Sequence, residues 1–230
     1  MTASEATERV FGGIYHITDT VLLQKLKEIA VIQSFAKGEI IHRSGEKPVA
    51  ATFLLNGVVR AFFISGKGEE LTDCFMSDFG YPTMTPDVNR PIFMTSEAVD
   101  QVEVLAVPLV SMFKLMEDHV QVLWAYNQML NWALLFHWQI KTSRVCFNAS
   151  ERYVWFRETF PKADAVAYGK HIASFLGMTP ETLSRIRKTQ PESESIPVMV
   201  EMRTEVSSDE LLKKMKNGFE AGKMEDWRVE

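Results

Sequence analysis

The chain has 230 residues, 46% of them hydrophobic, and a formal net charge of -5 at neutral pH. This length and apolar content allow one large or two modest globular domains with a real core. The first residues are polar and acidic, which argues against a secretory signal, and the spacing of Cys74 and Cys146 argues against a disulfide framework or a cysteine metal site. We therefore expect a cytoplasmic protein.

The first element in chain order is a short amphipathic helix over residues 18–27. Its apolar positions are Val21, Leu22 and Leu26, and either Thr18 or Asp19 can cap its first turn.

Residues 35–107 change to short apolar runs separated by turn residues. Asn56-Gly57 and Gly66-Lys67-Gly68 lie between strand-like runs, as hairpin turns require. The pattern predicts an all-β unit of many short strands, a roll or barrel.

After Pro108 the pattern predicts helix from Ser111 to about Phe147. Its central part, residues 120–140, has no formal charge and is long enough to cross a bilayer, but six hydrogen-bonding side chains are scattered through it. We therefore expect a helix buried on more than one side and no membrane partner.

Two neighbouring apolar stripes run along this helix. One face can lie on the β unit and the other can meet an identical helix, which predicts a homodimer through residues 120–144; the alternative is a core helix of a monomer. The first stripe comprises Val122, Tyr126, Met129, Ala133, Phe136 and Ile140, and the second comprises Val120, Leu123, Leu130 and Leu134.

A new helix is predicted to begin after Asn148. Asn148 and Glu151 have the spacing of a capping box, so Phe147 and Asn148 become a hinge candidate before a helical domain that ends near residue 190.

Residues 169–188 fit a helix-turn-helix with Gly177 at the turn. Glycine supplies the positive φ of a tight turn, Ala173 is small where the helices cross, and Thr179 can cap the second helix. Pro180 suits the first turn of that helix. The apolar positions that face the other helix and the core are Ile172, Leu176, Met178, Leu183 and Ile186.

The second helix of this motif offers side chains that suit the major groove of DNA. Arginine pairs with guanine, glutamate accepts from cytosine, and serine or threonine contacts several base edges. Four basic residues against one acid give residues 169–190 a net charge of +3 on an acidic chain. The exposed side chains that a major groove can use are Glu181, Thr182, Ser184, Arg185 and Lys188, and the phosphate or auxiliary candidates are Lys170, Thr179, Thr182, Arg187 and Lys188.

On residues 149–153 (ASERY) and 171–188 (HIASFLGMTPETLSRIRK), the chain resembles the Crp/Fnr family of bacterial transcription regulators. The resemblance implies an α+β fold with a β-roll sensor domain at 15–110, a long dimerisation helix at 111–147 and a helix-turn-helix domain at 148–190. It also implies that Glu181, Ser184 and Arg185 read base edges, that double-stranded DNA is a partner, and that RNA polymerase is a further partner hypothesis.

The sensor region departs from the pattern of the cyclic-nucleotide binders. Asp78-Phe79-Gly80 has no glutamate after its glycine, and Ile92 and Phe93 stand near the expected arginine, so we do not expect cyclic AMP or another cofactor. An apolar pocket for an unidentified small-molecule effector is one interpretation of the remaining residues, and the core of the roll is the other. The candidate pocket residues are Phe75, Met76, Phe79, Tyr81, Met84 and Phe93.

Two further functions remain open at this stage. A metal-dependent enzyme on a cupin-like β-barrel needs clustered ligands, but His42 is the only histidine in the strand region, so we predict neither an enzyme nor a metal site. A sensor that acts mainly through protein contacts is the second possibility, because residues 191–230 form an atypical extension with a net charge of -4.

Overall fold

The computed structural model describes residues 1–83 and 90–189. It begins with α1 (Ala3–Thr7), the π-helix η1 (Glu8–Ile14) and α2 (Thr20–Ile29). The Asp19 carboxylate accepts hydrogen bonds from the backbone N–H groups of Val21 and Leu22 at 2.9 and 3.0 Å. Of the two predicted caps for this helix, Asp19 is the one that forms.

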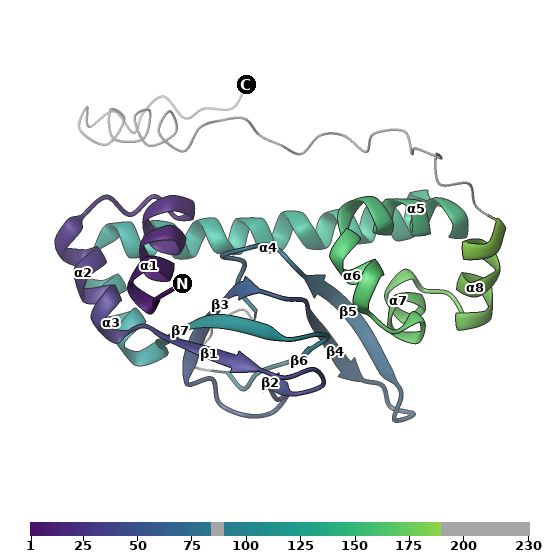
Figure 1. Ribbon diagram of the computed structural model, residues 1–230, viewed down its shortest axis with the longest axis horizontal. Coiled ribbons are helices and arrows are strands. Elements are labelled where there is room, and N and C mark those ends of the chain that lie inside the picture. The colour runs from purple at the N-terminus through teal and green to yellow at the C-terminus, as the bar shows by residue number, and fades with distance from the viewer. Residues whose placement is uncertain (84–89, 190–230) are drawn as a thin grey trace, which may run out of the picture. The chain divides into compact units, whose positions relative to one another are not determined.

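Within the described residues, seven strands follow and build two antiparallel sheets. One sheet has the order β1-β7-β3 and the other has the order β2-β6-β4-β5, so the predicted β-roll is confirmed (Figure 1). The strands are β1 (Val31–Phe35), β2 (Ile40–His42), β3 (Ala50–Asn56), β4 (Val59–Ile64), β5 (Glu70–Met76), β6 (Thr95–Ala98) and β7 (Val102–Pro108).

The two predicted hairpin turns have different outcomes. The turn at residues 66–68 joins β4 and β5, which pair from Ile64 opposite Glu70, and is a hairpin. The turn at Asn56-Gly57 instead connects β3 to β4, which belong to different sheets. Gly57 has φ +92°, and a Cβ there would lie 2.4 Å from the carbonyl oxygen of Gln101, so the chain needs glycine where it changes sheet.

The long helix predicted over residues 111–147 is two helices, α3 (Leu109–Asp118) and α4 (Val120–Cys146). His119 separates them with an extended backbone (φ -133°, ψ 108°). The buried residues Met112 and Leu115 of α3 and Val122 of α4 belong to one core, so the apolar spacing continues across the break and does not reveal it.

α4 has the two faces that its stripes predict. Val122, Met129 and Ile140 of the first stripe are buried, whereas the second stripe is exposed, with Leu134 at 57%. No helix in residues 1–83 and 90–189 is long and apolar enough to cross a membrane.

The chain then forms α5 (Ala149–Thr159), α6 (Pro161–Val166), α7 (Gly169–Leu176) and α8 (Pro180–Thr189) at the C-terminal end of α4 (Figure 1). The predicted capping box is present: the Asn148 side chain accepts from the Glu151 backbone, and Glu151 accepts from the Asn148 N–H at 2.8 Å. Phe156, Phe160 and Phe175 form the aromatic centre of this helical domain. The predicted extension at 191–230 lies outside the described residues.

Candidate DNA-binding surface and its junction with the β-roll

α7 and α8 form the predicted helix-turn-helix. Gly177 ends α7 in the left-handed conformation with φ +65°, and Met178 N–H returns to the carbonyl of Ala173 at 3.0 Å. This reversal lets backbone N–H groups donate to the last carbonyl groups of the helix. It needs a residue in the left-handed conformation, which glycine adopts at little cost. The Thr179 hydroxyl accepts the N–H of Thr182 at 3.2 Å and so caps α8 as predicted. Of the five predicted apolar contacts, Ile172, Leu176, Leu183 and Ile186 are buried, and Met178 is half-buried.

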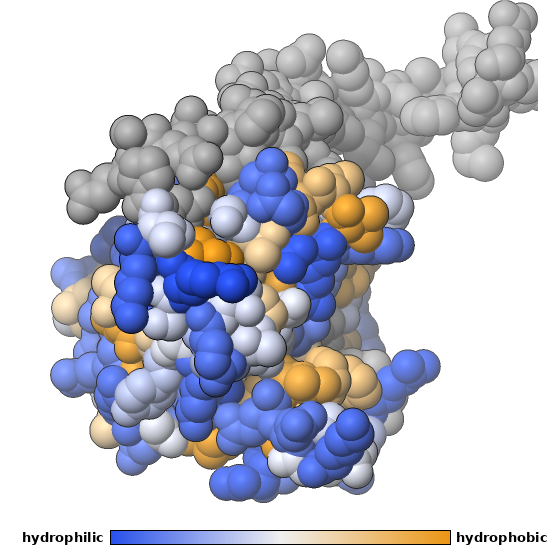
Figure 2. All heavy atoms as spheres, turned by 90° about the vertical axis from the view of Figure 1, so that its right-hand side faces the viewer, coloured by the Kyte–Doolittle hydropathy of each residue, from blue (hydrophilic) through white to orange (hydrophobic). Residues whose placement is uncertain are grey.

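The predicted base-reading residues lie on the opposite, exposed side of α8. Glu181, Ser184 and Arg185 are all exposed, and their spacing places them with Lys188 on one helical face. The pKa of Glu181 lies below its usual value because its own backbone N–H and the Thr179 hydroxyl hydrogen-bond its carboxyl group, so it is an acceptor at neutral pH. Figure 2 looks onto the end of the molecule that carries α8 and shows hydrophilic side chains across much of it.

The auxiliary candidates differ in their surroundings. Lys170 and Lys188 are exposed, and within residues 1–83 and 90–189 neither forms an ion pair. Arg187, in contrast, donates to the Asp164 carboxylate and to the Tyr153 hydroxyl, the latter at 3.1 Å. Its guanidinium is therefore already engaged in holding α8 against α5 and α6.

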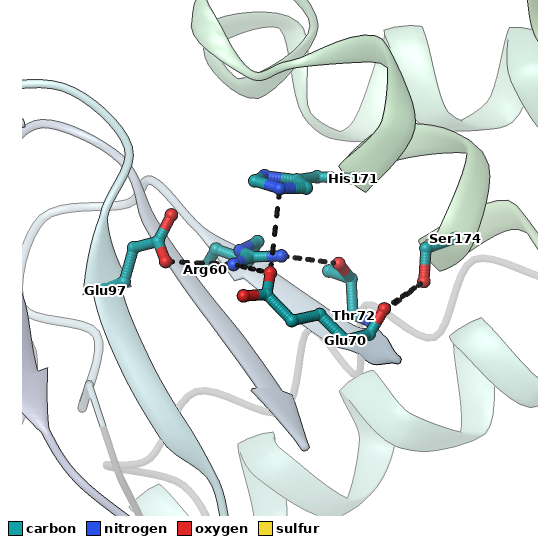
Figure 3. Close-up of polar contacts among 6 residues, drawn as sticks. All are labelled: Arg60, Glu70, Thr72, Glu97, His171 and Ser174. Atoms are coloured by element: carbon teal, nitrogen blue, oxygen red, sulfur yellow. Dashed lines mark hydrogen bonds and ion pairs between the residues drawn. The ribbon is translucent and has the colours of Figure 1, made fainter. Parts of the chain in front are cut away.

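The sequence interpretation missed a charged cluster that joins the helix-turn-helix to the roll. Arg60 of β4 is only 1% exposed, and one terminal nitrogen of its guanidinium donates to Glu70 of β5 at 2.7 Å and to Glu97 of β6 at 2.9 Å (Figure 3). The same guanidinium lies 4.1 Å from the centre of the Phe62 ring. The signal in the sequence is weak: a single arginine in an otherwise apolar strand.

α7 closes over this cluster (Figure 3). The Ser174 hydroxyl accepts the backbone N–H of Thr72 at 3.0 Å, and His171 Nε2 lies 3.8 Å from the Glu70 carboxylate. His171 is buried, and burial together with the charges of Arg60 and Lys170 lowers its pKa to about 4. We call Arg60, Glu70, Thr72, Glu97, His171 and Ser174 the roll–helix junction.

An aromatic contact extends the junction. Phe75 of β5 faces out of the roll, and its ring centre lies 5.6 Å from those of Phe156 and Phe175 in the helical domain. Arg144 near the end of α4 adds hydrogen bonds to the Phe175 carbonyl at 2.7 and 3.2 Å. The first helix of the helix-turn-helix is thus packed on the roll of the same chain.

The proposed effector residues do not come together in one cavity. Phe75 belongs to the junction, Phe79 lies under the Arg9 guanidinium, Tyr81 contacts Phe136 of α4, and Phe93 is 79% exposed. Met76 is buried, and Met84 lies outside the described residues. A small cavity of about 20 Å³ between α3, α4 and β3 is lined by none of them.

The histidine in the strand region has hydroxyl partners. His42 Nε2 lies 2.6 Å from the Thr52 hydroxyl and 3.2 Å from that of Thr83, inside the roll. Burial lowers the pKa of His42 to about 4, so the ring is neutral at physiological pH. Within residues 1–83 and 90–189, no group of three potential metal ligands is found.

Comparison with solved structures places this geometry among known proteins. FixK2 from Bradyrhizobium japonicum aligns with a TM-score of 0.59 at 22% identity over 70% of this chain and 83% of its own. A putative regulator of the Crp/Fnr family from Eubacterium rectale gives a TM-score of 0.62 at 16% identity, covering 76% of this chain and 84% of its own.

The regulator CLP from Xanthomonas campestris, described as responsive to c-di-GMP, gives a TM-score of 0.57 at 14% identity over 74% of this chain and 90% of its own. No protein-family model and no curated protein matches the sequence. At these identities the likeness concerns architecture. The chain has the fold of the Crp/Fnr transcription regulators, a cyclic-nucleotide-binding-like β-roll followed by a helix-turn-helix.

Proposed function

We propose that the protein is a homodimeric, sequence-specific DNA-binding transcription regulator of the Crp/Fnr type. The observation that carries the proposal is the α7–α8 motif, in which a buried apolar side fixes the two helices and leaves Glu181, Ser184 and Arg185 exposed together. Arginine and glutamate at such positions discriminate guanine and cytosine in the major groove. Lys188 on the same face and the exposed Lys170 of α7 are the phosphate contacts in this proposal, and DNA is the partner.

The exposed apolar face of α4 supports the homodimer. A helix that is buried on one side normally presents polar residues to water on the other, yet Leu123, Leu134 and Trp138 are exposed here. A second copy of α4 covers this face in a two-fold arrangement and brings two α8 helices to one side of a duplex. The target is then a roughly palindromic site whose half-sites lie about one helical turn apart.

The roll–helix junction supports regulation through the roll. Because β5 contacts α7 directly and Arg60 ties β5 to β4 and β6, a change of these strands alters the position of α8. The effector stays unidentified, and cyclic AMP is not our candidate. RNA polymerase is a further partner in this proposal.

The test is selection of bound sequences from random DNA by the full chain, followed by the same selection with Arg185→Ala. We expect an enriched two-fold symmetric motif and, for the variant, relaxed preference at one base pair of each half-site. Arg157→Ala, a change of the same kind on α5, serves as the control and retains the motif. Enrichment of no motif would favour action through protein contacts, and stoichiometric iron or manganese in the purified protein would favour the enzyme alternative.

A further inference from the structure

The exposed face of α4 follows the spacing of a coiled-coil seam. Steps of four and three residues alternate from one end of the helix to the other, as they do in parallel two-stranded coiled coils. Trp138 is 54% exposed and Val145 is 76% exposed, so the seam is open along its length in the single chain. The seam positions are Val120, Trp124, Asn127, Asn131, Leu134, Trp138, Lys141 and Val145.

Two asparagines occupy the middle of this apolar seam. Asn131 Nδ2 donates to Asn127 Oδ1 at 2.7 Å, and both side chains are exposed. Within one helix this bond leaves the amide N–H groups of Asn127 and the carbonyl oxygen of Asn131 available, so each copy presents both donors and an acceptor. A second copy related by a two-fold axis along the seam offers the complementary set.

Among the alignments of two copies with full overlap of the seam, only one brings these amides together. In the parallel, in-register pair, Asn127 and Asn131 lie level with the same two residues of the other copy. In an antiparallel pair with full overlap of the seam, Asn127 lies level with Trp138 and Asn131 with Leu134. If two parallel helices are shifted by one heptad, Asn127 lies level with Leu134 and Asn131 with Trp138. The antiparallel and the shifted alignments therefore both bury the amides without hydrogen-bond partners.

We propose that Asn127 and Asn131 form a polar layer that restricts self-association of α4 to the parallel, in-register pair of copies. This inference rests on the proposed homodimer. The polar layer weakens the dimer, as polar seam residues do, and in return it places both helix-turn-helix domains at the same end of the paired helices. The partner that fits the surface is a second copy of this chain, because an entirely apolar helix leaves the two amides unpaired.

The experiment measures alignment by disulfide formation in the full chain. All proteins carry Cys146→Ser, and Cys74 is buried. One protein carries Val145→Cys and a second carries Val120→Cys, and the two are mixed in a glutathione redox buffer and analysed by peptide mass spectrometry. Parallel pairing joins like positions. Only antiparallel pairing joins position 120 to 145, since these lie roughly 38 Å apart along one helix.

With the native asparagines we expect disulfides between like positions only. With Asn127→Leu and Asn131→Leu together, we expect the 120–145 disulfide to rise by about tenfold or more while the dimer dissociation constant falls. The double change to alanine keeps helix propensity and is expected to raise the same disulfide. Gln139→Leu, an amide-to-leucine change away from the seam, leaves the pattern unchanged.

The outcomes separate the two proposals. A monomer at micromolar concentration with the native asparagines overturns the homodimer itself. A dimer whose disulfide pattern is the same with asparagine, leucine and alanine at both positions overturns the polar layer and leaves the homodimer standing. Circular dichroism of every variant establishes that the helices are intact.

Discussion

Acidification tests the roll–helix junction through His171. The ring is buried, neither of its nitrogens has a hydrogen-bond partner among the described residues, and its pKa is lowered to about 4, first by burial and then by Arg60 and Lys170. The Glu70 carboxylate, 3.8 Å from the ring, raises the pKa of His171, but by less than burial and the two cations lower it. Protonation therefore costs free energy in the folded state.

The direction of the effect follows from proton linkage. In the unfolded chain a histidine binds its proton below pH 6.5, whereas the folded His171 stays neutral down to about pH 4. The unfolded state binds more protons in this window, so stability is lost as pH falls from 6.5 toward 4. Between pH 7 and pH 5 the loss from this one residue is about 2 kcal/mol, because each pH unit between 6.5 and 5 contributes about 1.4 kcal/mol.

The assay is urea unfolding at pH 7 and pH 5 of the native chain, His171→Phe and Ser174→Ala. Phenylalanine keeps an apolar ring beside Tyr168 but cannot take up a proton, so we expect the pH-dependent loss to shrink by about 2 kcal/mol. Ser174→Ala removes a junction hydrogen bond and should lower stability equally at both pH values. The pKa of His42 is also lowered to about 4, so His42 contributes the same pH-dependent loss of stability to all three proteins. If His171→Phe retains the full loss, the ring is not enclosed as described.

Five further substitutions test other parts of the structure. Phe75→Ala is expected to lower the free energy of unfolding by about 3–5 kcal/mol, because it removes a buried ring from the interdomain aromatic contact. Phe93→Ala, at an exposed position, should change the free energy of unfolding by less than about 0.5 kcal/mol. Denaturant titration measures both. Arg185→Ala should cost about 1–3 kcal/mol of DNA-binding free energy and relax the base preference. Lys188→Ala should lower the affinity for all DNA sequences alike and reduce the slope of log affinity against log salt concentration by about one. Fluorescence anisotropy measures both affinities. Asn148→Ala should destabilise the start of α5 by about 1 kcal/mol, seen as faster hydrogen exchange in its first turn.

The features that the sequence predicts well are those fixed by neighbouring residues. A helix cap depends on residues within one turn, so Asn148 could be assigned from spacing alone, and the cap of α2 could be narrowed to Thr18 or Asp19. Gly177 likewise stands where only a left-handed residue closes the turn between α7 and α8. The candidate base-reading face follows from the same local periodicity.

The features that sequence patterns miss depend on contacts between distant segments. Phe75 is apolar whether it faces the inside of the roll or the helical domain, so its alternation with Cys74 does not tell which side is covered. Arg60 and His171 are more than a hundred residues apart, and neither has a partner within its own element that indicates burial. The break at His119 leaves no signal in the sequence, because the apolar residues of both flanking helices pack into one core.

The enclosed guanidinium of Arg60 has a consequence for how the protein can be rearranged. Lifting α7 from the strands would uncover the charged cluster around Arg60 and leave the Phe75 ring facing water. Neither domain can therefore be exchanged without regard to the other. Grafting α7 and α8 onto another roll therefore requires transplanting the strand residues beneath them as well. In this chain the helix-turn-helix domain and the β-roll share one core.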